Sequence, residues 1–146
     1  MADQQRLLDL IANSRQGVLG VVTAAGYPHM TNVLYAWDAE QQMARVSTTA
    51  DRVKGRVLRR DPRAALHVAG SHFWSFAVAE CDAELSAVAT TAGDEGCLEL
   101  LAMARAIRDD VDEQAVFVRA VNEKRLVVRL KVRRLYGVLL DKPPGA

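Results

Sequence analysis

The segment RLVVRLKVR at Arg125–Arg133 shows the clearest periodicity in the chain. Every second residue from Leu126 to Val132 is aliphatic, and the positions between them are arginine or lysine except for Val127. A period of two is typical of a β-strand that packs one face on the protein interior and leaves the other in water. The segment therefore predicts a strand with a solvated, cationic face.

Working outward from this strand, the rest of the chain reads as further short strands and a few helices. Strands are expected at Val18–Thr23, His29–Trp37, Met43–Thr48, Ala64–Ala69, Phe73–Leu85 (with a bulge near Glu80 and Cys81) and Leu135–Leu140, and helices after Asp3, from Asp51 to Arg60 and around Asp94–Asp109. The connections between strands have hairpin lengths, which favours an antiparallel sheet. A closed or half-closed sheet leaves the fewest exposed edges. We therefore expect a mainly β fold, a β-barrel with short helices, forming one domain over residues 1–146.

Composition limits the possible partners. The 146 residues include 19 Lys/Arg and 18 Asp/Glu, a near balance that disfavours nucleic acid as a partner. The apolar stretches, such as GVLGVV at Gly17–Val22, are far shorter than the about 20 residues that a membrane helix needs. The first residues lack the pattern of a signal peptide, and Cys81 and Cys97 show no metal or redox spacing. We expect a cytoplasmic protein with reduced thiols and no membrane partner.

One segment nevertheless concentrates positive charge. Ser47–Leu66 reads STTADRVKGRVLRRDPRAAL, with six Lys/Arg residues between Arg52 and Arg63. On the predicted helix, Arg59 and Arg60 belong to the solvated side that an amphipathic helix normally has. Arg63 belongs to the start of the next strand, after the Asp61-Pro62 break that ends the helix.

Lys54 differs from these arginines because it falls among the apolar residues of the helix. Together with Arg52 it also places a cation in the first turn, where it opposes the helix dipole. A bound anion would remove this conflict, since free N–H groups, the dipole and both cations favour it, and Ser47 and Thr48 can add hydroxyl donors. The residues thus indicate a site for a phosphate-sized anion. The alternative is a surface helix whose lysine extends outward into solvent.

These residues also carry a resemblance. Tyr27-Pro28-His29, the strand ending Tyr35-Ala36-Trp37-Asp38, the segment VSTTADRVKGRVLRRDPRAAL and the ending RLVVRLKVRRLYGV together resemble the pyridoxamine 5'-phosphate oxidase-like, FMN-binding split β-barrels. The closer likeness is to the branch of F420-dependent enzymes, which use a deazaflavin in place of FMN. It extends over nearly the whole chain, and its most specific pieces are R-x-K followed by D-P-R and the terminal alternation ending in Tyr-Gly.

The resemblance implies a homodimer with two cofactor sites between the subunits. The residues it assigns to cofactor binding are Asn32 and Val33 along the ring, Ser47, Thr48, Arg52 and Lys54 at the phosphate, and Arg56 as a further contact to phosphate or to an anionic tail. The branch usually has proline near Asn32 and asparagine near Val57, so the choice between F420 and FMN stays open.

No other chemistry stands out in the sequence. His29, His67 and His72 share no ligand spacing with acidic residues or cysteine, so no metal site is expected. Cys81 lacks a basic neighbour that would activate it as a nucleophile. The expected function is an oxidoreductase in which reduced F420 gives hydride to a small organic substrate, with no side chain assigned as catalytic acid or base. The alternatives are an FMN-dependent oxidase or reductase of the pyridoxamine-phosphate-oxidase type and a non-catalytic flavin or deazaflavin carrier.

Overall fold

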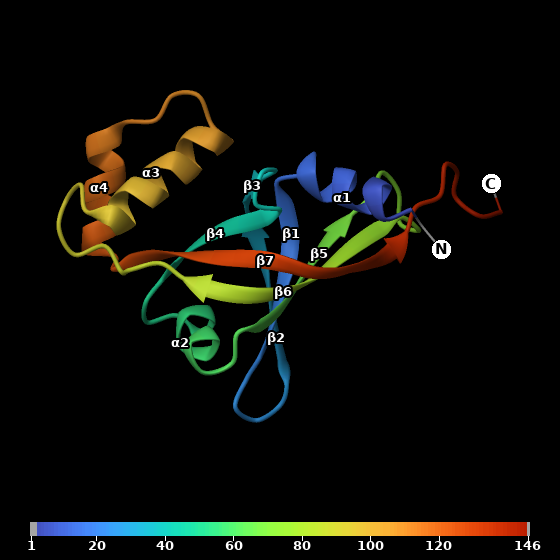
Figure 1. Ribbon diagram of the computed structural model, residues 1–146, viewed down its shortest axis with the longest axis horizontal. Helices are drawn as coiled ribbons and strands as arrows, with labels where there is room; N and C mark the ends of the chain where they lie inside the picture. The colour runs from blue at the N-terminus through green and yellow to red at the C-terminus, as the bar shows by residue number, and fades with distance from the viewer. Residues whose placement is uncertain (1–2, 146) are drawn as a thin grey trace.

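A single antiparallel sheet forms the body of the protein (Figure 1). The computed structural model describes residues 3–145. Its elements are α1 (Gln4–Ala12), β1 (Gln16–Val22), β2 (Pro28–Leu34), β3 (Ala36–Asp38), β4 (Met43–Thr49), α2 (Val53–Arg60), β5 (Arg63–Ala69), β6 (Phe76–Leu85), α3 (Glu95–Ile107), α4 (Glu113–Asn122) and β7 (Arg125–Val138). The seven strands are ordered β2-β1-β5-β6-β7-β4-β3, and all neighbours are antiparallel.

The sheet curls around one hydrophobic core, as a half-barrel does. Alternate residues of β1, β5 and β7, including Leu19, Leu66 and Leu130, point into this core and are at most 1% exposed. Helix α1 packs on the same core through Leu7 and Ile11. The prediction of a mainly β barrel with short helices is confirmed. No helix within residues 3–145 has the length and hydropathy to cross a bilayer.

Strand β7 is one continuous strand, whereas the sequence predicted two. The predicted bulge near Glu80 and Cys81 is confirmed and explains the difference. Glu80 pairs with Arg134 and Cys81 with Val132, so Arg133 is the extra residue of the bulge. The alternation changes phase at this point, and two adjacent arginines both face outward, a pattern that imitates the end of a strand.

Other expected elements are divided or shortened. The strand predicted at His29–Trp37 is interrupted at Tyr35, because β2 pairs with β1 whereas β3 pairs with β4. The Tyr35 side chain is completely buried, and its hydroxyl donates to the Ile11 carbonyl at 2.6 Å. Phe73 and Trp74 precede β6 instead of belonging to it, and Phe73 is 85% exposed.

Helix α4 was not predicted, and it corrects the expectation that the Arg125–Arg133 face is solvated. Helices α3 and α4 cover this face at the start of β7, on the opposite side of β4 from α2 (Figure 1). Phe117 and Ala120 of α4 enclose Val127, which is fully buried. Only these two α4 residues are buried, so the apolar pattern of the helix was too sparse to reveal it.

Candidate functional site

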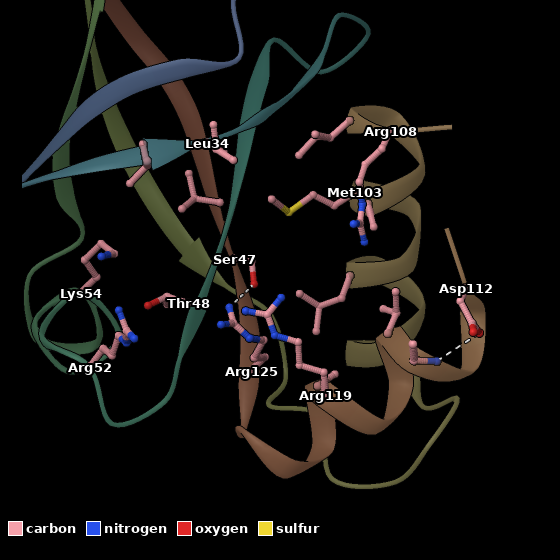
Figure 2. Close-up of a pocket in the computed structure, with 18 of the residues that line it drawn as sticks. Leu34, Ser47, Thr48, Arg52, Lys54, Met103, Arg108, Asp112, Arg119 and Arg125 are labelled. Atoms are coloured by element: carbon pink, nitrogen blue, oxygen red, sulfur yellow. Dashed lines mark hydrogen bonds between the residues drawn. The ribbon is translucent and has the colours of Figure 1, made fainter. Parts of the chain in front are cut away.

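A cleft of about 950 Å³ opens where the ends of β2 and β4 meet the start of α2 and the pair α3–α4. Six of the seven residues predicted to bind a cofactor line it, namely Asn32, Val33, Ser47, Thr48, Arg52 and Lys54. Arg56 is exposed on α2 and does not line this cleft. Figure 2 shows Arg52, Lys54 and Thr48 on one side of the β4 ribbon, and Arg125, Arg119 and Met103 on the other.

The first turn of α2 has no side-chain cap. Arg52 is the N-cap residue, in extended backbone conformation, and its side chain makes no capping hydrogen bond. The first N–H groups of a helix have no intrahelical acceptor, so they are available to a ligand. The nearest carboxylate in sequence, Asp51, accepts from the Thr49 hydroxyl at 2.8 Å. The start of α2 therefore presents positive potential without an acidic residue in its first turn.

Lys54 is buried beside this helix start, and only 9% of the residue is exposed. Its Nζ donates to Thr31 Oγ1 of β2 at 3.3 Å, and no carboxylate of residues 3–145 lies within 4.0 Å of it. Burial, and secondarily the nearby Arg52 charge, lowers the pKa of Lys54 from its ordinary value. The alternative of a lysine extending outward into solvent is wrong, because this side chain turns inward toward β2.

Ser47 and Thr48 present their hydroxyl groups on opposite faces of β4. Ser47 Oγ accepts a hydrogen bond from Arg125 Nη1 at 2.9 Å. Thr48 is 3% exposed, and its Oγ1 has no hydrogen-bond partner among the described residues. Buried hydroxyl groups normally have a partner, so the Thr48 hydroxyl lacks a hydrogen bond that the described residues do not supply.

The far wall of the cleft comes from α3, α4 and the start of β7, and sequence reasoning did not assign these residues to the site. Arg125 was placed on a solvated face, but its side chain is only 17% exposed. The one local signal for α4 was Asp112, whose carboxylate caps the helix by accepting from the Ala115 N–H at 3.3 Å. Arg119 of α4 reaches the cleft as well.

The cleft has an apolar part next to these polar groups. Val33 of β2 and the α3 residues Leu100, Met103 and Ile107 line this part. Cations, free N–H groups and hydroxyls at one end, followed by aliphatic side chains, suit a ligand with an anionic group attached to an apolar ring system.

Other reactive side chains do not gather here. Within residues 3–145, no group of three or more His, Cys, Asp or Glu side chains is placed to hold a metal ion. Burial, reinforced by Asp82 and Glu80, raises the pKa of the Cys81 thiol to about 12. This cysteine stays protonated at neutral pH and is a poor nucleophile.

Comparison with known proteins agrees with this architecture. A conserved hypothetical protein from Mycobacterium tuberculosis is 22% identical, with a TM-score of 0.72 over 100% of this chain and 94% of that chain. An F420 reductase is 18% identical, with a TM-score of 0.65 over 88% and 94% of the two chains. A FAD-binding protein from Mesorhizobium loti is 14% identical, with a TM-score of 0.63 over 93% and 94%. At these identities the likeness shows the fold.

The family comes from the sequence match. Residues 4–139 match the family described as pyridoxamine 5'-phosphate oxidase, a range that includes all seven strands and all four helices of residues 3–145. The chain belongs to the pyridoxamine 5'-phosphate oxidase family and has its split β-barrel fold.

Proposed function

We propose that this protein is an oxidoreductase that binds F420 in the cleft and acts on a small organic substrate. The observation that carries the proposal is Lys54, a buried cation without a carboxylate, next to the uncapped start of α2. An isolated buried charge is costly unless something compensates it, and a phosphate would do so. F420 is preferred because the sequence resembles the F420-dependent branch, and an F420 reductase is among the similar structures.

The described residues fit a phosphorylated ring cofactor. Lys54, Arg52 and the first N–H groups of α2 would hold the phosphate, and Thr48 would donate a hydrogen bond to it. Ser47, whose hydroxyl lies on the other face of β4 beside Arg125, would donate to another part of the ligand. The backbone at Asn32 and Val33 would run along the ring, and the α3 wall would exclude water from it. The bound deazaflavin would supply the hydride chemistry, while the protein supplies binding and orientation. Arg56, outside the cleft, would act only through its charge.

FMN is the second candidate cofactor, because its phosphate would use the same donors. Similarity to a FAD-binding protein favours a flavin in the same measure as similarity to an F420 reductase favours the deazaflavin. The absorption spectrum of the purified protein separates them. A yellow, fluorescent protein supports FMN, and a colourless protein that binds added F420 tightly supports the first proposal. Binding without turnover over a substrate panel would instead indicate a carrier.

We also propose a homodimer in which a second copy covers the outer face of the sheet. Met30 and Leu34 of β2 are 64% and 56% exposed, and Tyr136 and Val138 of β7 are each 41% exposed. Exposed apolar residues grouped on one face are typical of an interface. Sedimentation equilibrium should give twice the 16.0 kDa of the chain, and Tyr136→Glu should shift it toward monomer. A wild-type monomer would contradict this proposal.

A cytoplasmic location is part of the proposal. Cys81 and Cys97 are both free and buried, which fits a reducing compartment. Fractionation of the native host should recover the protein with soluble cytoplasmic markers.

The decisive test is Lys54→Ala. We expect affinity for F420, measured by fluorescence titration, to fall at least about tenfold, since a charge-assisted hydrogen bond to phosphate is lost. Arg59→Ala, an exposed cation at the far end of α2, is the matched control and should change affinity less than about twofold. Unchanged affinity in a folded Lys54→Ala protein would contradict the anion site.

A further inference from the structure

Arg125 donates a hydrogen bond to a neutral hydroxyl group inside the cleft. Its Nη1 donates to Ser47 Oγ at 2.9 Å. The two residues come from different strands, and the β4–β7 register sets Arg125 opposite Thr49, two residues beyond Ser47. Figure 2 shows this hydrogen bond in the middle of the cleft. The contact is thus fixed by sheet register.

The direction of the hydrogen bond restricts what Ser47 can do. A guanidinium can only donate, so it occupies a lone pair of Ser47 Oγ. The hydroxyl proton must then point elsewhere, and no acceptor for it is present among the described residues. Because Ser47 lines the cleft, its hydroxyl is left as a hydrogen-bond donor toward a bound ligand.

Arg125 is itself held by a carboxylate. Its Nε and Nη2 each lie 3.3 Å from an oxygen of Glu123, at the C-terminal end of α4. The same carboxylate accepts from Arg119 Nε at 2.8 Å. Hydrogen bonds from Arg125 first and Arg119 second lower the pKa of Glu123, so it stays ionised. Glu123 therefore keeps the guanidinium plane oriented toward Ser47.

We propose that Arg125 is a positioning residue that fixes the Ser47 hydroxyl as a hydrogen-bond donor to the bound cofactor, with Glu123 as its anchor. The inference rests on the proposed function, since it assumes a cofactor bound in the cleft that Ser47 lines. It predicts that Arg125 contributes to affinity only while Ser47 is present. A direct contact between Arg125 and the cofactor predicts a contribution in either case.

A double-mutant cycle separates these two roles. The affinity of F420, and in parallel of FMN, is measured for wild type, Ser47→Ala, Arg125→Met and the double variant. We expect each single variant to bind about fivefold more weakly, as for one lost hydrogen bond, and the double variant to bind no more weakly than Ser47→Ala. Effects that multiply in the double variant would overturn the inference. So would wild-type affinity in Arg125→Met.

Charge is controlled with two further variants. Arg105→Met removes the same charge from α3, outside the cleft and without touching Ser47 or Glu123, and should change affinity less than about twofold. A loss equal to that of Arg125→Met would overturn the positioning role. Glu123→Gln raises the net charge of the cleft, which by charge alone would tighten anion binding. If Arg125 acts as a positioning residue, Glu123→Gln should instead bind the cofactor more weakly. This variant replaces Arg125→Met as the test if Arg125→Met does not fold.

The outcome stays separable from that of the proposed function. Suppose that Lys54→Ala loses cofactor affinity tenfold or more, and that the effects of Ser47→Ala and Arg125→Met multiply in the double variant. That result would reject the inference and keep the proposed function. Wild-type affinity in Lys54→Ala with a non-multiplicative cycle would reject the anion site at α2 and keep the role of Arg125 toward Ser47.

Discussion

Two cationic regions of this molecule differ in how their charges are paired. The arginines on the sheet surface beneath α3 form ion pairs, whereas Lys54 at the start of α2 does not. Beneath α3, the carboxylate of Glu99 accepts from Arg45 at 3.2 Å and from Arg129 at 2.8 Å. Arg45 also binds Asp38, and Arg129 also binds Glu84. At the start of α2, Lys54 has only the neutral Thr31 hydroxyl as a partner among the described residues.

The paired region contributes to the stability of the fold, and the unpaired region is available to bind a ligand. Paired charges beneath α3 fasten the helix to β4 and β7 and leave little for a ligand. An unpaired buried lysine costs stability, and such a cost is typical of residues kept for function. The comparison therefore indicates in which region a substitution should affect folding and in which it should affect ligand affinity.

The largest expected effect is on stability, from Glu99→Ala. Removing this carboxylate leaves Arg45 and Arg129 with one partner fewer each in a half-buried layer, which should lower the free energy of unfolding by about 2–3 kcal/mol. Urea unfolding gives the measurement. Asp109→Ala, an exposed carboxylate just after α3, is the control and should change stability by less than about 0.5 kcal/mol. Equal effects would mean that the pairing contributes nothing.

The Glu99 network should also make the free energy of unfolding depend on pH in the acidic range. Hydrogen bonds from Arg129, followed by its charge and Arg45, lower the pKa of Glu99 below its ordinary value of 4.5. This contribution is therefore complete above about pH 4.5 and is lost as the pH falls through the folded-state pKa. The free energy of unfolding of the wild type should exceed that of Glu99→Gln at neutral pH. This difference, measured at several pH values, should shrink below pH 4.5. A constant difference would contradict the assignment.

At the start of α2, Lys54→Met should raise stability while it abolishes tight binding. The pKa of Lys54 is lowered, so the unfolded chain holds this proton better, and the cost is complete below the folded-state pKa and relieved as the pH rises toward 10.5. Without cofactor at pH 7, we expect a gain of about 1 kcal/mol in unfolding free energy. A loss of stability would show that the ammonium is already compensated inside the protein.

The smallest expected effect is that of Arg56→Ala. This side chain is exposed and lies outside the cleft, so it should act only through screened charge. Its removal should weaken F420 binding less than about threefold at physiological salt, and less still at 0.5 M salt. A tenfold loss that persists in high salt would return Arg56 to the site as a direct contact.

Much of the fold and part of the site could be predicted because their signals are local. The alternation around Leu126–Val132, the proline after Asp61 and the bulge near Glu80 depend on neighbours within a few residues. The inward direction of Lys54 followed from helix periodicity alone. Helix α4 escaped because only Phe117 and Ala120 are buried, and their partner Val127 comes from another element.

The sequence by itself determined the strand pattern and the helix that starts with unmatched cations beside Ser47 and Thr48, since periodicity and capping act over one or two turns. The family resemblance, and not periodicity, added Asn32 and Val33 to the residues that the cleft unites. Only the tertiary structure decided which cations are neutralised. Arg129 meets Glu99 because α3 docks on β7, and Arg125 meets Ser47 because β4 and β7 pair in one register. Ion pairs between residues distant in sequence depend on docking and register, and the same segment of alternating arginines would be solvated without them.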